Sequence, residues 1–298
     1  DYSLRDYVIN ASGVDSLNVA DAIIYPDSGN LTVERNARIR TLKNARILLD
    51  SIVRYHSFNK STVDIFGKNN YEATGDYVYI DALDNKQQIY FSEISVNQDT
   101  ISVAKGNVSK EKDFKIGSRY NYYGNIRLIG DRKDLEFTGY FKLSHNCPSF
   151  SKKWISFSSF IDPYNISFSF NDDLYSDNDD KLYSGIYYNR DSSIYYSTFL
   201  STKKRAKDIE FFQSGSSVYY NNDLSSYIVG GLDSSSNYLI LDDKTCSVSG
   251  SGIIDLNFNL GRINTTSVGN IYNRNGEIGF DGFVLFDFDF SEKALEIM

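Results

Sequence analysis

The residues with the clearest capacity for chemistry lie in an acidic segment at residues 171–180. Carboxylate and amide oxygens are the ligands that Ca²⁺ prefers, and the ion takes about six to eight of them. The ligand order of an EF-hand loop is absent, because no glycine occupies the required place and no glutamate closes the segment. We therefore favour a solvated acidic loop, with Ca²⁺ as the one candidate cofactor. The candidate ligands are Asp172, Asp173, Asp177, Asp179 and Asp180.

A second group with binding chemistry is formed by tyrosines in the second half of the chain. A doublet such as Tyr187-Tyr188 places one ring on each face of a strand, so one ring of each pair should be exposed. Exposed tyrosine rings stack on sugars or fill protein interfaces. The alternative, which we weigh more heavily, is that the rings replace aliphatic side chains in a sheet core. The candidate surface comprises Tyr183, Tyr187, Tyr188, Tyr195, Tyr196, Tyr219 and Tyr220.

Catalytic motifs are sparse. His56 and His145 are the only histidines, and neither stands in a nucleophile motif. The sequence contains no G-x-S-x-G motif, phosphate-binding loop or dinucleotide fingerprint. A glycosidase needs only two carboxylates, and a β-helical polysaccharide lyase could use Lys, Arg or Tyr as its base, but no spacing indicates either. We therefore expect a non-enzymatic protein and assign no catalytic residue.

Composition and charge narrow the class of protein further. Hydrophobic residues make up 41% of the 298 residues, which excludes a disordered chain. Residues 1–150 carry as many basic as acidic side chains, so the net charge of −8 resides in residues 151–298 and argues against a nucleic-acid partner. We interpret the basic run at residues 203–207 as a solvated loop. No apolar stretch approaches the roughly 18 residues that a spanning helix needs, so we expect no membrane-spanning segment.

The cysteines leave the redox state open. Cys147 and Cys246 are the only two, and a bridge between them would stabilise the fold by about 4–5 kcal/mol in the chain-entropy model. Two free buried thiols fit the sequence equally well. A composition rich in Tyr, Asn, Ser and Asp and poor in Met leads us to expect an extracytoplasmic location: periplasm, outer membrane or cell surface.

The elements that must position these residues are strands. Alternation of apolar and polar residues predicts strands at 125–129, 135–143, 165–170, 252–258 and 283–290. It also predicts a hairpin, with strands at 76–81 and 88–91 joined by a turn at Asp84-Asn85. β-branched and aromatic residues fill these runs, as half-buried sheet surfaces prefer. The chain is therefore expected to be all-β, with few or no helices.

Two further patterns bear on the architecture. Residues 36–54 fit either one helix or two strand-like rungs, and we favour the rungs because the flanking residues 30–34 and 62–67 read as strands. Glycines recur in the middle of alternating runs and should mark bulges or corners. Repeated corners favour a β-solenoid-like fold or a coiled roll of stacked strands and hairpins. The corner glycines include Gly75, Gly106, Gly124, Gly139 and Gly185.

The domain organisation follows from a change in composition. Two prolines, Cys147, the acidic segment and the shift in charge all fall within residues 145–180. We therefore divide the chain into a charge-neutral β-rich segment at 1–160 and an acidic, tyrosine-rich β segment at 161–298, which could be continuous with the first. Both ends read like the interior of a protein, so we expect a piece excised from a longer or processed chain.

Several segments resemble known proteins. The sequences AIIYPDSGNLTV, ARIxTLxNA, LEFTGY and GSGIIDL resemble segments of very large, uncharacterised β-rich cell-envelope proteins of Bacteroidota, and they begin at residues 22, 37, 135 and 250. Residues 72–79 and 102–108 resemble, more weakly, the strand–Ala-x-Gly–strand rungs of lipopolysaccharide-transport jelly-roll proteins. The first resemblance implies a large envelope protein with no established activity.

These observations lead to one principal expectation and two alternatives. The principal one is a non-enzymatic, extracytoplasmic β-rich scaffold or binding segment of a larger cell-envelope protein. Its partners would be neighbouring segments of the parent chain or other envelope proteins, with a glycan as a further candidate. The first alternative is a carbohydrate-binding or carbohydrate-active module, and the second is a lipid-conducting groove.

Overall fold

The computed structural model describes residues 2–3, 7–50, 55–148, 150, 152–170, 173–189, 191–192, 194–231, 237–251, 253–258, 261–274 and 277–288, and all structural statements concern these residues. The fold is all-β, as predicted. One short 3₁₀ turn, η1 (Arg35–Ala37), is the only helical element in this part of the chain, and every strand pairing described there is antiparallel. None of its helical segments has the length and apolarity needed to cross a membrane.

The chain forms two compact units. The first contains residues 1–139 and 158–165, and the second contains residues 140–157 and 166–298. The predicted boundary at residue 160 thus falls inside the short segment that returns to the first unit. Each unit is described by itself below.

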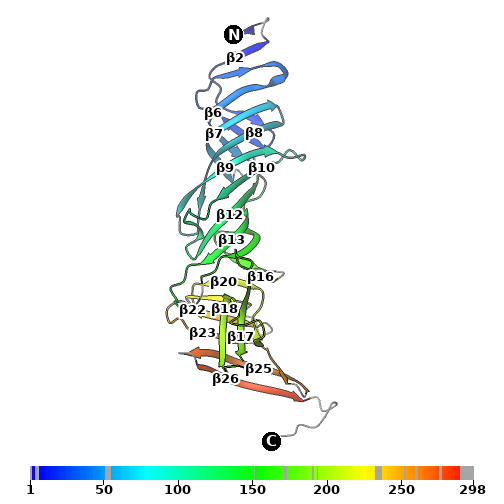
Figure 1. Cartoon of the computed structure of the whole chain (residues 1–298). Helices are drawn as coiled ribbons and strands as arrows, with labels where there is room; N and C mark the ends of the chain where they lie inside the picture. The colour runs from blue at the N-terminus through cyan, green and yellow to red at the C-terminus, as the bar shows by residue number, and fades with distance from the viewer. Residues whose placement is uncertain are drawn as a thin grey trace. The chain divides into compact units, whose positions relative to one another are not determined.

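One large antiparallel sheet supplies the strands of the first unit, and residues 140–143 of β13 and 155–157 of β14 are counted with the second unit. Its 14 strands follow one another in nearly the order of the chain, β1-β2-β5-β6-β7-β8-β9-β10-β12-β13-β14, while β3, β4 and β11 pair beside this path. Figure 1 labels β2, β6, β7, β8, β9, β10, β12 and β13 of this series. The strands are β1 (Tyr2–Ser3), β2 (Val8–Ala11), β3 (Leu17–Val19), β4 (Ala22–Tyr25), β5 (Leu31–Val33), β6 (Ile39–Leu49), β7 (His56–Gly67), β8 (Asn70–Ile80), β9 (Lys86–Val96), β10 (Ser102–Val108), β11 (Phe114–Gly117), β12 (Tyr120–Ile129), β13 (Leu135–Leu143) and β14 (Ile155–Ile161).

Aromatic rings fill the core of this unit. Phe58 and Phe91 are fully buried and meet edge to face with ring centroids 5.3 Å apart. Tyr122 and Phe137 do the same at 5.1 Å. Such edge-to-face pairs add about 0.5–1.5 kcal/mol each beyond the burial of their area. The alternation in these strands therefore has the predicted cause, because one face of β7, β9, β12 and β13 supplies the buried rings.

The predicted hairpin is confirmed as β8 and β9, which pair from Ile80 opposite Lys86 inward. The Asp81 carboxylate holds the turn, since Oδ1 accepts hydrogen bonds of 2.9 Å from the backbone N–H groups of Leu83 and Asn85. Asp84 adopts a φ of 60°, which aspartate tolerates better than most residues. The turn therefore lies at Asp84-Asn85 as predicted, but the carboxylate that holds it belongs to Asp81, which was predicted to end the strand.

Residues 36–54 form a strand, as favoured over a helix, but one strand and not two rungs. They contain the end of η1 and one continuous strand, β6, and residues 51–54 lie outside the described residues. Ile39, Leu42 and Ala45 are buried, and β6 advances three residues from each to the next while β7 advances two. Each extra residue turns the two-residue repeat of a strand into a three-residue spacing that imitates a helix.

The prediction that glycines mark bulges is confirmed at three positions. The register between neighbouring strands shifts at Gly75, at Gly106 and at Gly185. Gly124 and Gly139 have a different role, because β12 and β13 approach each other closely there. A Cβ atom on Gly139 would lie 2.7 Å from the Cα atom of Gly124, so neither position accommodates a side chain.

Two antiparallel sheets form the second unit. The larger has the order β15-β20-β21-β22-β23-β25-β24, with β26 beside β25, and the smaller has the order β16-β17-β18, with β19 beside β17. The strands are β15 (Ser167–Ser169), β16 (Leu174–Tyr175), β17 (Lys181–Asn189), β18 (Ile194–Ser201), β19 (Ile209–Gln213), β20 (Ser217–Asn221), β21 (Ser226–Val229), β22 (Tyr238–Asp242), β23 (Val248–Ser251), β24 (Ile253–Phe258), β25 (Gly261–Arg274) and β26 (Glu277–Phe288).

A disulfide bond joins Cys147 to Cys246 within this unit, with the two Cα atoms 5.3 Å apart. The sequence left the choice between a bridge and two free thiols open, and the structure decides it in favour of the bridge. Cys147 is fully buried, and its backbone N–H donates a 3.2 Å hydrogen bond to Nδ1 of His145. The bond therefore lies in a packed region of the unit.

Candidate functional site

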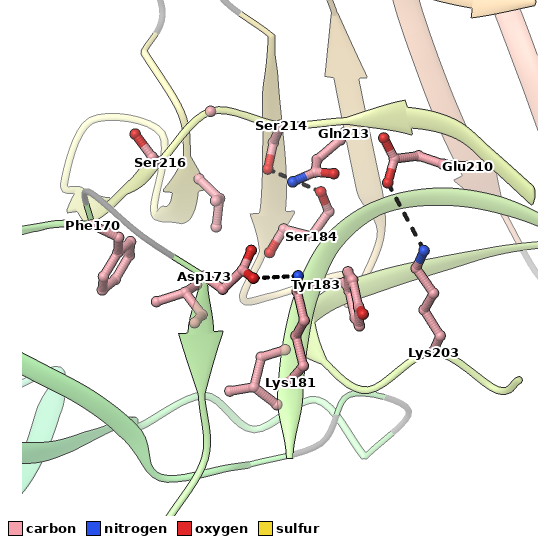
Figure 2. Close-up of a pocket in the computed structure, with 14 residues that line it drawn as sticks. Phe170, Asp173, Lys181, Tyr183, Ser184, Lys203, Glu210, Gln213, Ser214 and Ser216 are labelled. Carbon is pink, nitrogen blue, oxygen red and sulfur yellow. Dashed lines mark hydrogen bonds and ion pairs between the residues drawn. The ribbon is translucent and has the colours of Figure 1, made fainter. Parts of the chain in front are cut away.

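A polar cavity of about 430 Å³ lies in the second unit, beside strands β17 and β19 (Figure 2). It is the candidate functional site because it brings together residues from both groups that the sequence singled out. Tyr183 comes from the tyrosine group and Asp173 from the acidic segment. Lys181, Lys203 and Glu210 add charge to the same cavity.

Strand β17 positions one side of the cavity. Lys181 and Tyr183 are two residues apart, so they project from the same face of the strand. The register of β17 shifts relative to β18 between Tyr183 and Gly185, and relative to β19 between Ile186 and Tyr187. Such shifts re-aim neighbouring side chains and often accompany binding sites.

Gly185 is required at this place. A Cβ atom there would lie 3.2 Å from the carbonyl carbon of Phe212 on the adjacent strand, and closer still to its oxygen. Only a residue without a side chain lets β19 approach β17 at this point. This approach places Gln213 opposite Gly185, and Glu210 opposite Tyr187, at the edge of the cavity.

Two ion pairs border the cavity. The ammonium group of Lys181 donates a hydrogen bond to the Asp173 carboxylate, and this bond raises the pKa of Lys181. Lys203 Nζ lies 3.9 Å from Glu210 Oε2, which is an ion pair too long for a hydrogen bond. Figure 2 shows both pairs on either side of Tyr183.

Lys203 occupies an unusual environment. Its side chain is only 15% exposed, and its Nζ atom lies 4.4 Å from the ring centroid of Tyr183 and 4.5 Å from that of Tyr187. The ammonium therefore faces two aromatic rings, an arrangement that stabilises a cation by about 0.5–2 kcal/mol per ring. The interpretation of residues 203–207 as a solvated loop is thus wrong for Lys203, although residues 204–207 are exposed as expected.

The loop that carries Lys203 is anchored by Tyr196. The hydroxyl of Tyr196 donates a 2.5 Å hydrogen bond to the Asp208 carboxylate and accepts a 3.1 Å bond from the backbone N–H of Lys204. The same carboxylate accepts a 3.1 Å bond from the backbone N–H of Arg205. Burial, together with this carboxylate, raises the pKa of Tyr196 to about 12. Tyr196 therefore acts as a structural anchor.

The opposite wall is a loop, residues 214–216, whose backbone makes several hydrogen bonds to neighbouring segments. Ser214 donates from its backbone N–H and from its hydroxyl to the carbonyl of Ser184, at 3.0 and 3.1 Å. Gly215 N–H donates to the carbonyl of Asn237, and the carbonyl of Ser216 accepts from Phe170 N–H, each at 2.7 Å. The loop is therefore held in one conformation and presents serine side chains to the cavity.

The seven tyrosines of the predicted surface do not form one surface in the structure. Tyr183 alone among them lines the cavity. Tyr187 and Tyr196 are buried, so the assignment of these two to an exposed surface is wrong; the core alternative holds for them. Tyr188, Tyr219 and Tyr220 are partly exposed and do not line this cavity, and the side chain of Tyr195 lies outside the described residues.

The aspartates of the acidic segment contact different partners and do not converge on one point. Asp173 pairs with Lys181, and Asp180 lies 3.3 Å from Lys153 Nζ. Asp177 N–H donates to the carbonyl of Trp154, and Asp179 has a φ of 60° in a turn closed by its own N–H to the Ser176 carbonyl. Asp172 lies outside the described residues.

In the part of the chain that the structure describes, no group of three or more His, Cys, Asp or Glu residues is placed to hold a metal ion. The calcium site therefore gains no support and stays a prediction.

Sequence reasoning missed Lys203, Glu210 and Gln213. The alternation of Lys181 and Tyr183 was a usable signal for one side of the cavity. No local pattern indicates that Lys203 turns inward, because its burial depends on rings supplied by another strand. No protein-family model, curated protein or solved structure matches this chain.

Proposed function

We propose that this chain is a non-enzymatic, extracytoplasmic scaffold and binding segment of a larger cell-envelope protein. The observation that carries the proposal is the antiparallel sheet of the first unit, whose 14 strands succeed one another almost in chain order. A sheet of this kind extends a chain as a continuous structure with side chains available along its exposed face.

Hydrogen bonds between distant parts of this sheet support a coiled roll as its form. The backbone N–H of Ser102 donates a 2.9 Å bond to Asp21, a residue 81 positions earlier in the chain. His56 contacts the carbonyl of Arg132 across 76 positions. A flat meander would bring only neighbouring strands together, whereas a rolled sheet also joins strands that are far apart along the path.

The disulfide bond supports the extracytoplasmic location. Disulfides persist in oxidising compartments and are rare where thioredoxin and glutathione keep thiols reduced. The bond between Cys147 and Cys246 lies in a packed region, as a structural bridge does. The partners proposed are neighbouring segments of the parent chain or other envelope proteins, with a glycan as a further candidate.

A co-sedimentation experiment tests this function. The purified chain is mixed with a washed envelope fraction of a Bacteroidota bacterium and pelleted, and the supernatant is assayed for released sugar reducing ends and for cleaved esters. We expect the chain in the pellet and no product, with heat-unfolded chain as the control. Product release with saturation kinetics would overturn the non-enzymatic assignment. Folded chain that stays in the supernatant would overturn the binding role.

The cavity of the second unit favours a carbohydrate-binding module as the second candidate. It combines the ring of Tyr183 with two carboxylates, Asp173 and Glu210, and both features occur together in sugar sites. A lipid-conducting groove gains no such support, because Phe58, Phe91 and Phe137 fill the described interior of the first unit.

A further inference from the structure

We infer that the cavity beside β17 binds an acidic sugar, with the sugar carboxylate on Lys203 and the sugar ring against Tyr183. This inference names the ligand class of the binding segment proposed above and rests on that proposal. It is carried by the geometry around Lys203, by the ring of Tyr183 and by the pairing of the other charges in the cavity.

The ammonium of Lys203 is a partly buried cation with unused hydrogen-bonding capacity. It has three N–H donors, and within the described residues its only acidic neighbour is Glu210, at 3.9 Å. Its other close neighbours are the faces of Tyr183 and Tyr187, which attract the charge but accept no strong hydrogen bond. A group that carries negative charge and short-range acceptors satisfies this cation best.

The two carboxylates of the cavity already have hydrogen-bond donors. Asp173 accepts the hydrogen bond from Lys181. With the Gln213 amide turned so that its nitrogen faces Glu210, that nitrogen lies 2.8 Å from Oε2 and 3.1 Å from Oε1. Both carboxylates therefore already have a hydrogen-bond donor, whereas Lys203 is held only by the longer ion pair with Glu210 and keeps its N–H donors for an incoming anion.

The ligand is a sugar because of what surrounds the cation. Tyr183 lies between the two lysines and presents its ring at the cavity (Figure 2). The cavity is also lined by Ser214, Ser216, Gln213 and the two carboxylates, whose polar groups are hydrogen-bond partners of the kind that sugar hydroxyls need. A volume of about 430 Å³ accommodates one or two sugar units.

Calorimetric titration with matched pairs of sugars tests the inference. The probes are trimers of galacturonate, glucuronate and mannuronate, each paired with the neutral trimer of galactose, glucose or mannose, and inorganic phosphate as an anion without a ring. We expect at least one uronate trimer to bind at least about tenfold more tightly than its neutral counterpart, since a charge-assisted hydrogen bond exceeds a neutral one by that factor. Phosphate should bind more weakly than that trimer.

Substitutions of Lys203 and Tyr183, each with a control substitution nearby, test whether these residues cause the preference for uronates. Lys203→Met keeps the aliphatic stem between the rings and should lower affinity for the uronate at least about tenfold, while Lys203→Arg should retain most of it. Lys204→Met is the matched control, because Lys204 has the same charge, lies over Tyr196 and does not line the cavity. Tyr183→Leu should weaken both members of a pair, and Tyr188→Leu on the same strand should weaken neither. Thermal unfolding of each variant verifies that it is folded.

The outcomes separate this inference from the proposed function. Equal affinity for a uronate and its neutral counterpart, or an unchanged affinity in Lys203→Met, overturns the acidic-sugar assignment and leaves a sugar-binding segment standing. Phosphate that binds as tightly as the uronates overturns the role of the sugar ring. If no trimer binds, the inference is overturned, and co-sedimentation with the envelope fraction still decides the proposed function independently.

Discussion

His56 Nε2 lies 2.6 Å from the carbonyl oxygen of Arg132, a residue 76 positions further along the chain. Its Nδ1 lies 3.1 Å from the hydroxyl oxygen of Tyr77, so a neutral ring satisfies both neighbours by donating to the carbonyl and accepting from the hydroxyl. The imidazole is almost fully buried. The His56 side chain thus links the start of β7 to the turn before β13, and its charge depends on pH.

The stability of the first unit should therefore fall in mild acid. Burial lowers the pKa of His56 and outweighs the Arg132 hydrogen bond and the charges of Asp134 and Asp50, which raise it. Below about pH 6.5 the unfolded chain takes up the proton before the folded chain does. The stability is constant above that pH and declines by up to about 1.4 kcal/mol per pH unit as the pH falls toward the folded pKa. Hydrogen exchange of β7 amides between about pH 8 and 5 measures this decline.

The His56→Gln variant is the control for this prediction. Glutamine can replace the hydrogen bond to Arg132 but does not titrate, so the decline at β7 should be shallower than in the unchanged chain. The second unit contains its own buried histidine, His145, whose pKa is also lowered by burial, and its amides should respond to pH independently of this substitution. Equal slopes at β7 in both proteins would contradict the assignment to His56.

Loss of the disulfide should destabilise the second unit alone. The bond spans 99 positions, and the chain-entropy model assigns a loop of this length about 4–5 kcal/mol. The Cys147→Ser/Cys246→Ser double variant should therefore shift the denaturant midpoint of the second unit downward and leave that of the first unit in place. Reductant added to the unchanged protein should reproduce the shift, and a midpoint that does not respond to reductant would count against the prediction.

Gly139→Ala should be among the most disruptive small substitutions in the first unit. The added Cβ would lie 2.7 Å from the Cα atom of Gly124, and backbone atoms cannot move aside as side chains do. We expect a loss of about 2–3 kcal/mol by overpacking. Gly67→Ala is a matched control, because Gly67 has a φ of 159° against 158° for Gly139, but nothing lies within 4 Å of its added Cβ. Similar losses in urea unfolding for the two variants would assign the effect to backbone conformation instead.

Asp21→Ala should remove a polar anchor inside the first unit. The carboxylate of Asp21 accepts hydrogen bonds from the backbone N–H of Ser102 at 2.9 Å and from its hydroxyl at 2.5 Å, and that hydroxyl also lies 2.6 Å from the Tyr71 hydroxyl. Ser102 and Tyr71 are both fully buried, so the variant leaves donors without acceptors and should cost about 2–3 kcal/mol. The exposed Asp27→Ala substitution should change the unfolding free energy by less than about 0.5 kcal/mol. An equal effect of the two would argue against an anchor at Asp21.

The strands were readable from the sequence because alternation and turn chemistry are local. The turn at Asp84 and the strand at 135–143 needed only neighbouring residues to be recognised, and both match the structure. The sequence left residues 36–54 open between a helix and strands, because the register shifts in β6 depend on its pairing with β7. A bulge arises from the pairing of two strands, so the sequence of one strand alone does not predict where it occurs.

The site could be predicted only in part from the sequence, because it too depends on contacts between strands. Tyr183 and Asp173 stood out by residue type, and the structure places both at the cavity. The burial of Tyr187 and Tyr196 and the inward position of Lys203 result from contacts between β17, β18 and the loop after β18. Alternation predicts that one ring of a doublet is buried, but it does not say which one.

The position of the disulfide has a mechanical consequence. Cys147 precedes every residue that lines the cavity, and Cys246 follows every one of them. A pulling force applied to the chain on either side of this pair is transmitted through the covalent bond and bypasses residues 148–245. Tension along the backbone therefore does not pass through the residues that line the cavity, and the chain outside the disulfide-closed loop carries it.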